Sequence, residues 1–338
     1  MVAQIDRRYL TVSPGKTLAR LISYGLFEGR PLTTRGRWIN PLVFANAGLI
    51  KRYAVETRPE KPLFIVGTGR SGTTILGVVL SLHPQLGFLN EPKALWHSAF
   101  DREDLTGSYT DEPALYRLTA RHATPEVVRS MRRLYGAYMV GVQAERVLDK
   151  YPELIFRVPF VQAIFPDARF IVLVRDGADA CRSVNAWSSR HGVSRAGETH
   201  DWWGRNDRKW RCMVDELVRP DPELGELTEV IRRFDRQTDR AAVEWLLSMR
   251  EGMRLLDEQP EAAYCVRYEE LARAPVETLR QLFDFCDLPL DALTVNYASA
   301  TLRPGVAPVT PLELDPAIAP AFAATRRALG YPDIGDFR

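Results

Sequence analysis

A glycine-rich loop carrying a cation and several hydroxyls is the segment of this chain whose residue types best suit chemistry. Residues 67–74 read GTGRSGTT and directly follow the apolar run 63–66, LFIV. The run predicts a buried parallel strand, and the residues after the loop predict a helix over 74–82. A strand, a tight turn and a helix N-terminus aim backbone N–H groups at an anion. We therefore expect phosphate-type binding by Gly69, Arg70, Ser71, Gly72, Thr73 and Thr74.

The loop departs from the nucleotide-triphosphate consensus G-x-x-x-x-G-K-[ST] at its lysine. Gly67 and Gly72 have the consensus spacing, but Thr73 takes the lysine position and the positive charge lies three residues earlier, at Arg70. The consensus lysine reaches the β- and γ-phosphates, so a site without it is poorly suited to ATP. A P-loop kinase or NTPase stays open as an alternative, although no convincing Walker-B acid follows a strand.

A second arginine follows a second predicted strand. Residues 169–174, RFIVLV, end at Arg175, and a helix is expected from about 178 to 187. Ligands of parallel sheets bind at the carboxyl ends of the strands, where both arginine-containing turns fall. Strands separated by helices predict an α/β fold, a P-loop-like three-layer sandwich with a central parallel sheet flanked by helices.

The rest of the chain is less regular. Residues 100–150 are predicted to be mainly helical and polar. Residues 188–235 are charged, hold Trp202, Trp203 and Trp210, and are predicted to form an insertion or mobile lid. The tryptophans could stack on a sugar or apolar acceptor, or anchor the insertion to the core. A helix over 239–258, a strand over 264–268 and a helix from Pro275 complete the domain, which we place at 61–338.

Composition favours an ordinary globular protein. The 338 residues are 46% hydrophobic with a net charge of +2, and no run of 18 apolar residues is present. The N-terminus lacks the apolar core of a signal peptide, and four widely spaced cysteines form no metal pattern, so we expect a cytoplasmic protein with reduced thiols and no metal. Nothing indicates a nucleic-acid partner.

The first 60 residues form a basic extension. They hold ten Lys/Arg against four Asp/Glu, together with apolar stretches at 18–27 and 41–44. Such a segment either packs on the domain with its charges solvated or lies on an anionic membrane. The second alternative would place the protein at the inner face of the membrane.

Taken together, the motifs resemble sulfotransferases that use 3′-phosphoadenosine 5′-phosphosulfate (PAPS), over roughly residues 61–290. The loop at 69–74 resembles their 5′-phosphosulfate loop, and Arg175 with Ser183, eight residues later, resembles their 3′-phosphate motif. The segments 150–152, 157–160 and 165–170 look like those of Golgi-type and many bacterial members. The stretch 266–271 resembles the later strand whose tyrosine, here Tyr268, packs near the adenine.

This resemblance implies PAPS as donor and roles for three residues. Arg70 would stabilise charge on the leaving group, and Arg157 matches a lysine near the sulfonate in tyrosylprotein sulfotransferases, with a structural ion pair as its alternative. Glu91 lies 21 residues beyond Arg70, like the catalytic Glu of those enzymes, and would be the base; its alternative is a structural carboxylate. The steroid- and phenol-type enzymes instead use a histidine in the segment near 157, and none occurs there.

The expected reaction is sulfuryl transfer to a hydroxyl of a carbohydrate, lipid or small-molecule acceptor. Positioning and charge stabilisation would carry most of the catalysis, by analogy with phosphoryl transfer. A non-catalytic relative that kept the nucleotide cleft is the remaining alternative. The acceptor is not indicated by the sequence.

Overall fold

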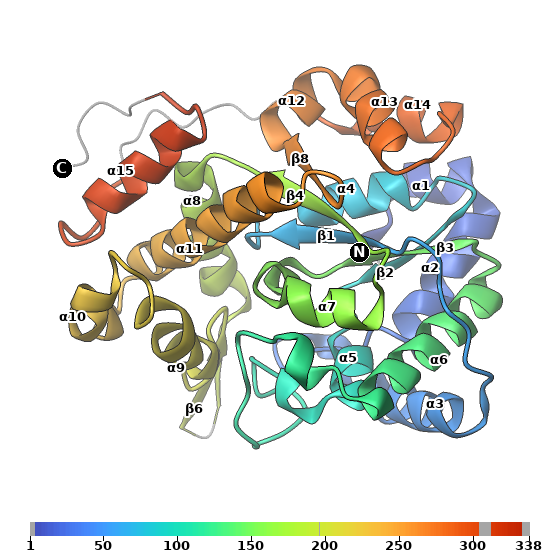
Figure 1. Cartoon of the computed structure of the whole chain (residues 1–338), viewed down its shortest axis with the longest axis horizontal. Helices are drawn as coiled ribbons and strands as arrows, with labels where there is room; N and C mark the ends of the chain where they lie inside the picture. The colour runs from blue at the N-terminus through green and yellow to red at the C-terminus, as the bar shows by residue number, and fades with distance from the viewer. Residues whose placement is uncertain (1–3, 196, 304–311, 333–338) are drawn as a thin grey trace.

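A five-stranded parallel sheet forms the centre of the computed structural model, which describes residues 4–195, 197–303 and 312–332 (Figure 1). The strands are β1 (Leu63–Gly67), β2 (Leu86–Asn90), β3 (Arg146–Lys150), β4 (Arg169–Val174) and β8 (Ala263–Arg267). Their order is β2-β3-β1-β4-β8, with Leu63 in register with Leu148 and Arg169. The two arginine-containing turns therefore leave adjacent strands at the same edge of the sheet.

Alternate side chains of each strand enter two separate cores. Phe64 and Val66 of β1 belong to one buried cluster, whereas Leu63 and Ile65 belong to the other. Because successive side chains of a strand point to opposite faces, both faces of the sheet must be covered.

Helices supply that cover on both faces. One face carries α4 (Thr73–Leu80), α12 (Tyr268–Arg273), α13 (Pro275–Phe285) and α14 (Ala292–Thr301). The other carries α5 (Lys93–Ala99), α6 (Pro125–Val142), α7 (Val158–Ile164), α8 (Gly177–His191), α11 (Gln237–Glu258) and α15 (Ala319–Ala328) (Figure 1). The predicted three-layer α/β fold is confirmed. No helix among the described residues is both long and apolar enough to cross a membrane.

The N-terminal extension is built into the domain. It forms α1 (Arg7–Val12), α2 (Pro14–Leu26) and α3 (Asn40–Tyr53). Arg20 is buried, pairs with Glu28 at 2.6 Å and donates to the Phe88 carbonyl of β2, while Glu28 accepts from the Asn90 amide. These contacts tie the extension to the strand that ends next to Glu91.

The segment 188–235 also packs on the core. It forms a small antiparallel sheet of β5 (Val193–Arg195), β6 (Glu198–Asp201) and β7 (Gly204–Arg205), then α9 (Arg208–Met213), a π-helical turn at 214–218 and α10 (Thr228–Arg232). Trp203 and Trp210 are buried and pack edge to face at 5.3 Å. These two tryptophans anchor the segment, whereas Trp202 is only half-buried.

One central strand, β3, falls within the region 100–150 that was predicted to be mainly helical. Its sequence, RVLDK, has only two apolar residues, so no apolar run marks it. Asp149 lies fully buried in it and accepts hydrogen bonds from Trp96 Nε1 at 2.8 Å and the Tyr135 hydroxyl at 2.5 Å. Burial raises the pKa of Asp149 to about 7, despite the lowering effect of these hydrogen bonds.

Replacing Asp149 with Asn should make stability less dependent on pH. An acid whose pKa is raised on folding stabilises the fold below its unfolded pKa of about 3.9 and loses that contribution as pH rises through about 7. Asn stays neutral and keeps one carbonyl acceptor. We expect the melting temperature of Asp149→Asn, relative to wild type, to rise by several degrees between pH 5 and pH 8. A difference independent of pH would contradict the assignment.

Candidate active site

The glycine-rich loop contains positive φ angles, which glycine adopts more readily than other residues. Gly67 and Gly72 have φ of 135° and 97°. A Cβ at Gly67 would lie 2.7 Å from the Leu173 carbonyl oxygen, and one at Gly72 would lie 2.4 Å from the Tyr268 ring. Arg70, with φ of 67°, is a non-glycine residue held in the left-handed region. Such backbone strain is concentrated at functional sites. Here the strained residue lies three positions before α4, whose N-terminus can bind an anion.

Two hydroxyl groups of the loop are buried and lack a hydrogen-bond partner among the described residues. Thr68 Oγ1 and Ser71 Oγ have no hydrogen-bond partner among the described residues, and neither has the buried Arg175 Nε. Buried polar atoms are normally satisfied, because leaving one unpaired costs about 1–3 kcal/mol. These atoms therefore fit a bound anion with several acceptor oxygens, as a phosphosulfate or phosphate group has.

The structure brings the predicted donor-site residues together. Arg70 Nε donates to Ser183 Oγ at 3.1 Å, and Arg175 Nη1 donates to the Arg70 carbonyl at 3.1 Å. The Arg175 guanidinium lies 4.6 Å from the centre of the Tyr268 ring. Residues far apart in the sequence thus form one cationic cluster beside the loop.

Glu91 lies at the end of β2 in a strained conformation, with φ of 49°. Its amide donates to the Lys150 carbonyl at 2.7 Å, and its carboxylate lies 2.5 Å from Lys150 Nζ and 3.7 Å from Lys93 Nζ. Burial alone would raise the pKa of Glu91, but Lys150 and Lys93 outweigh it and lower the pKa. The carboxylate is therefore ionised at neutral pH and able to accept a proton.

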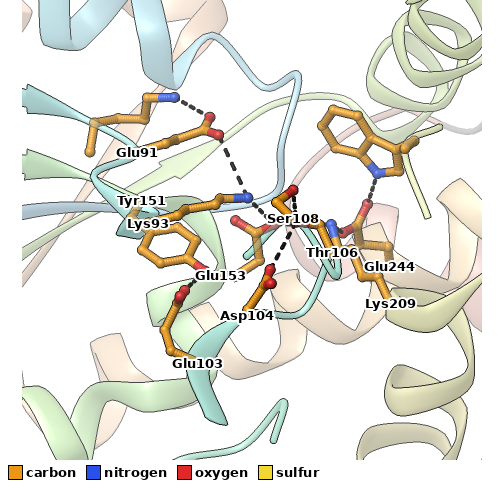
Figure 2. A network of polar contacts seen from close by, with 12 residues as sticks. Glu91, Lys93, Glu103, Asp104, Thr106, Ser108, Tyr151, Glu153, Lys209 and Glu244 are labelled. Carbon is orange, nitrogen blue, oxygen red and sulfur yellow. Dashed lines mark hydrogen bonds and ion pairs between the residues drawn. The ribbon is translucent and has the colours of Figure 1, made fainter. Parts of the chain in front are cut away.

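A chain of alternating charges runs from Glu91 into the 188–235 segment (Figure 2). Lys93 Nζ lies 3.4 Å from Glu153, and Lys209 Nζ lies 3.0 Å from Glu153 and 2.6 Å from Glu244. Glu244 in turn accepts from Trp202 Nε1 at 2.7 Å. Because Lys209 is nearly fully buried, its charge requires both carboxylates, and the chain fixes Trp202 in place.

Glu91 and the loop face the same cavity. Its open space is about 600 Å³, and Gly69, Glu91 and Lys93 contribute to its wall. Trp202 lies over the loop, since a Cβ on Gly69 would meet its ring at 2.4 Å. Thr106, Ser108, Pro152 and Glu153 also line it, and most of the remaining lining comes from the two segments that matched no motif in the sequence. These residues are Pro31, Leu32 and Thr33 of the extension, and His200, Asp201, Trp202, Gly204, Arg205 and Lys209 of the insertion, with Trp187 just before it.

The contacts of Arg157 fit the structural alternative, an ion pair, better than the predicted second cationic role. It is fully buried and donates to the backbone carbonyls of Glu103, Leu115 and Tyr116, and it pairs with the Glu103 carboxylate at 3.3 Å. With its donors occupied this way, the guanidinium does not reach the cavity wall. The cations beside Glu91 are instead Lys150 and Lys93.

Three lysines of the site were not assigned from the sequence. Lys150 lies inside the Lys150-Tyr151-Pro152 segment that carried part of the resemblance, and Lys93 lies two residues after Glu91, so both had a usable signal. Lys209 had none, because only the folded insertion brings it to Glu153.

Comparison with known proteins identifies the family. The family described as "Sulfotransferase family" matches residues 62–227 and 223–292, which together exceed half of the chain. The chain therefore belongs to the sulfotransferase family, and the resemblance noted from its motifs is confirmed.

Individual relatives are distant. The chain is 24% identical to the "Protein-tyrosine sulfotransferase" of Drosophila melanogaster over 258 residues, which cover 75% of this chain and 44% of that protein. It is 28% identical to "Protein-tyrosine sulfotransferase 1" of Mus musculus over 151 residues, covering 43% and 40%. The chain thus spans about half the length of the curated relatives it matches.

Solved structures with a similar overall path include the sulfotransferase STF9 of Mycobacterium avium. That structure has a TM-score of 0.49 and 16% identity, with 97% of this chain and 90% of that chain covered. A sulfotransferase domain from the curacin biosynthetic pathway has a TM-score of 0.45 and 18% identity, with 82% and 99% covered.

Proposed function

We propose that this protein transfers the sulfuryl group of PAPS to a hydroxyl of an acceptor bound in the cavity beside Glu91. The observation that carries the proposal is that Glu91 and Gly69 of the loop line the same cavity. A proton acceptor and an anion-binding loop at one cavity are what group transfer to a hydroxyl requires.

The residues present fit PAPS as the donor, which supplies an activated sulfuryl group on a 5′-phosphate. The loop amides and the unpaired hydroxyls of Thr68 and Ser71 suit the phosphosulfate end. Arg175 and Ser183 suit the 3′-phosphate, because an arginine fork and a hydroxyl form strong charge-assisted bonds to such a group. Tyr268 packs against Gly72 and Arg175, and this position supports its proposed role beside the adenine.

The roles of the chain's own groups follow from their positions. Glu91 accepts the hydroxyl proton of the acceptor. Lys150, whose Nζ lies 2.5 Å from Glu91, keeps this carboxylate ionised, and Arg70 stabilises charge on the leaving group. Desolvation lowers the pKa of Arg70, and the negative charge of Glu91 acts in the opposite direction.

The cavity wall suits a ring-shaped acceptor. Trp187 and Trp202 meet edge to face at 5.3 Å on one side of the cavity, and the wall also carries the charged residues Glu91, Lys93, Glu153, Asp201, Arg205 and Lys209. Stacking on indoles fits a sugar, an aromatic alcohol or the head of an amphiphile. The names of the relatives add tyrosine in a peptide to this set.

A transfer assay with ³⁵S-labelled PAPS tests the proposal. The panel would contain sugars, phenols, a tyrosine peptide and a lipid-linked alcohol, each incubated with wild type and with Glu91→Gln. We expect label on at least one class with wild type and none with the variant. The proposal fails if no class accepts label and the protein also does not bind the 3′,5′-bisphosphate product.

A P-loop kinase or NTPase is the less favoured function. The loop has Thr73 where such enzymes place lysine, and Thr73 is buried at the start of α4. A non-catalytic relative is disfavoured by the ionised Glu91 at the cavity wall, since a binding protein has no need of it.

Replacing Trp202 with Ala should uncouple donor cleavage from transfer. Its ring covers Gly69 and shields the loop from water, so we expect acceptor-independent release of bisphosphate to rise several-fold relative to transfer. Trp187→Ala is the matched control, because Trp187 lines the cavity but packs on Trp202 rather than on the loop. An unchanged ratio of hydrolysis to transfer in Trp202→Ala would contradict the shielding role.

A further inference from the structure

Exposed apolar side chains form a stripe along the outer face of α3 and the 3₁₀ turn Arg35–Ile39 that precedes it. Trp38, Leu42, Leu49 and Tyr53 are 79%, 55%, 60% and 68% exposed, and Ala45 between them is exposed as well. The spacing of three or four residues places Leu42, Ala45, Leu49 and Tyr53 on one side of α3, and Trp38 lies in the turn directly before it. We call these five residues the α3 stripe.

The inner face of the same helix already has its partners. Val43 and Ala47 are buried, and α3 packs on α5 and α6. The helix therefore does not need the stripe to stay on the domain, and the stripe is available for another surface.

Exposed apolar residues are concentrated in this part of the molecule. Of the fourteen large apolar side chains exposed among the described residues, eight lie within the first 60 positions. They include Leu18 and Leu21 on α2, which packs against α3. A soluble domain scatters such residues singly, whereas a contiguous set marks an interaction surface.

The charges around the stripe are positive. The exposed Arg37 and Arg52 lie at its two ends, and α3 contains no Asp or Glu. Glu28, one of only four acids in residues 1–60, is buried against Arg20 and Arg30. Arg20 and Arg30 are buried with it, so the remaining residues of the extension hold eight Lys/Arg against three Asp/Glu and are still basic.

From this combination we infer that the α3 stripe docks on an anionic lipid surface, with the helix lying in the interfacial plane. An apolar face with aromatic residues and flanking arginines is the pattern of interfacial helices. A second copy of this chain fits less well. Pairing two stripes would set arginine against arginine in either orientation, because α3 offers no carboxylate to receive them.

Docking of the α3 stripe would also turn the cavity toward the bilayer. This part of the inference rests on the proposed function. Thr33, a residue of the cavity wall, precedes Trp38 by only five positions, so the wall and the stripe belong to one connected segment. The acceptor class that suits this arrangement is an amphiphile whose hydroxyl-bearing head enters the cavity while its tail stays in the bilayer.

Vesicle sedimentation with the full-length protein tests the inference. Wild type is incubated with vesicles of phosphatidylcholine alone or with one quarter phosphatidylglycerol, and with no donor or acceptor present. We expect binding to the anionic vesicles only, reduced about tenfold or more in the double variant Trp38→Ser/Leu49→Ser and weakened in Arg52→Glu. The control Val276→Ser/Leu290→Ser removes two exposed apolar residues outside the extension and should bind like wild type.

Two results would overturn the inference. One is the absence of wild-type binding to anionic vesicles. The other is loss of dimeric protein in size-exclusion chromatography of the double variant, which would assign the stripe to self-association. Thermal shift with the bisphosphate separates this test from the proposed function, because the double variant should retain a wild-type shift. Vesicle binding without any bisphosphate shift would sink the sulfotransferase assignment and leave the lipid surface standing.

Discussion

Replacing Glu91 with Gln is expected to lower turnover by about 10²–10⁴-fold while leaving the affinity for the bisphosphate product unchanged. Gln has nearly the same shape but cannot accept the acceptor's proton. The lysines beside Glu91 hold its pKa below the ordinary value of 4.5, although burial acts in the opposite direction. Protonation of Glu91 should therefore reduce kcat/KM only below pH 4.5. Around neutral pH the titration of Glu91 should not change the activity.

Glu153→Gln is the matched control for this prediction. Glu153 also lines the cavity, but its carboxylate is held by Lys93 and Lys209, and those cations lower its pKa despite burial. We expect this variant to lose thermal stability, with a smaller effect on turnover. Near-normal turnover in Glu91→Gln together with a collapse in folded Glu153→Gln would move the base to Glu153.

Replacing Arg175 with Ala should weaken binding of the 3′,5′-bisphosphate by about 100-fold, as expected for loss of a charge-assisted fork to phosphate. The guanidinium is held beside the loop by the Arg70 carbonyl and the Tyr268 ring, and its Nε is buried without a partner among the described residues. These contacts preorganise it for an anion.

The ligand itself provides the control. Adenosine 5′-phosphate lacks the 3′-phosphate, so its affinity should change little between wild type and Arg175→Ala. Arg182→Ala, on the helix that follows Arg175 and paired with Asp179 at 3.4 Å, should bind both ligands normally. Equal losses for both ligands would show that Arg175 acts on the loop and not on the 3′-phosphate.

The parts of the fold that could be predicted are those with strong local patterns. β1, α4, β4 and α11 have long apolar runs or a clear apolar face, and their bounds agree with the expected ranges to within a few residues. β3 could not be found this way, because a strand with Lys150, Asp149 and Arg146 among its five residues is recognisable only by its buried neighbours.

The site shows the same division. The loop, Arg175, Ser183 and Glu91 follow strands, and parallel strands bring their carboxyl ends to one edge, so their convergence was predictable. The burial of Arg157 was not, since residues 103–116 close over it through backbone carbonyls. Likewise only the folded insertion separates the buried anchors Trp203 and Trp210 from Trp202 at the cavity. The cytoplasmic location stays a prediction.

A thermal-shift measurement of nucleotide preference tests most directly whether this site is built for a sulfuryl donor. We predict that the 3′,5′-bisphosphate raises the melting temperature of wild type in the presence of EDTA by several degrees, since at 100 times Kd it would stabilise by about 2.7 kcal/mol. The shift should be largely absent in Arg175→Ala. A shift with ATP and Mg²⁺ but none with the bisphosphate would contradict this account. It would indicate instead that the loop binds a nucleotide triphosphate.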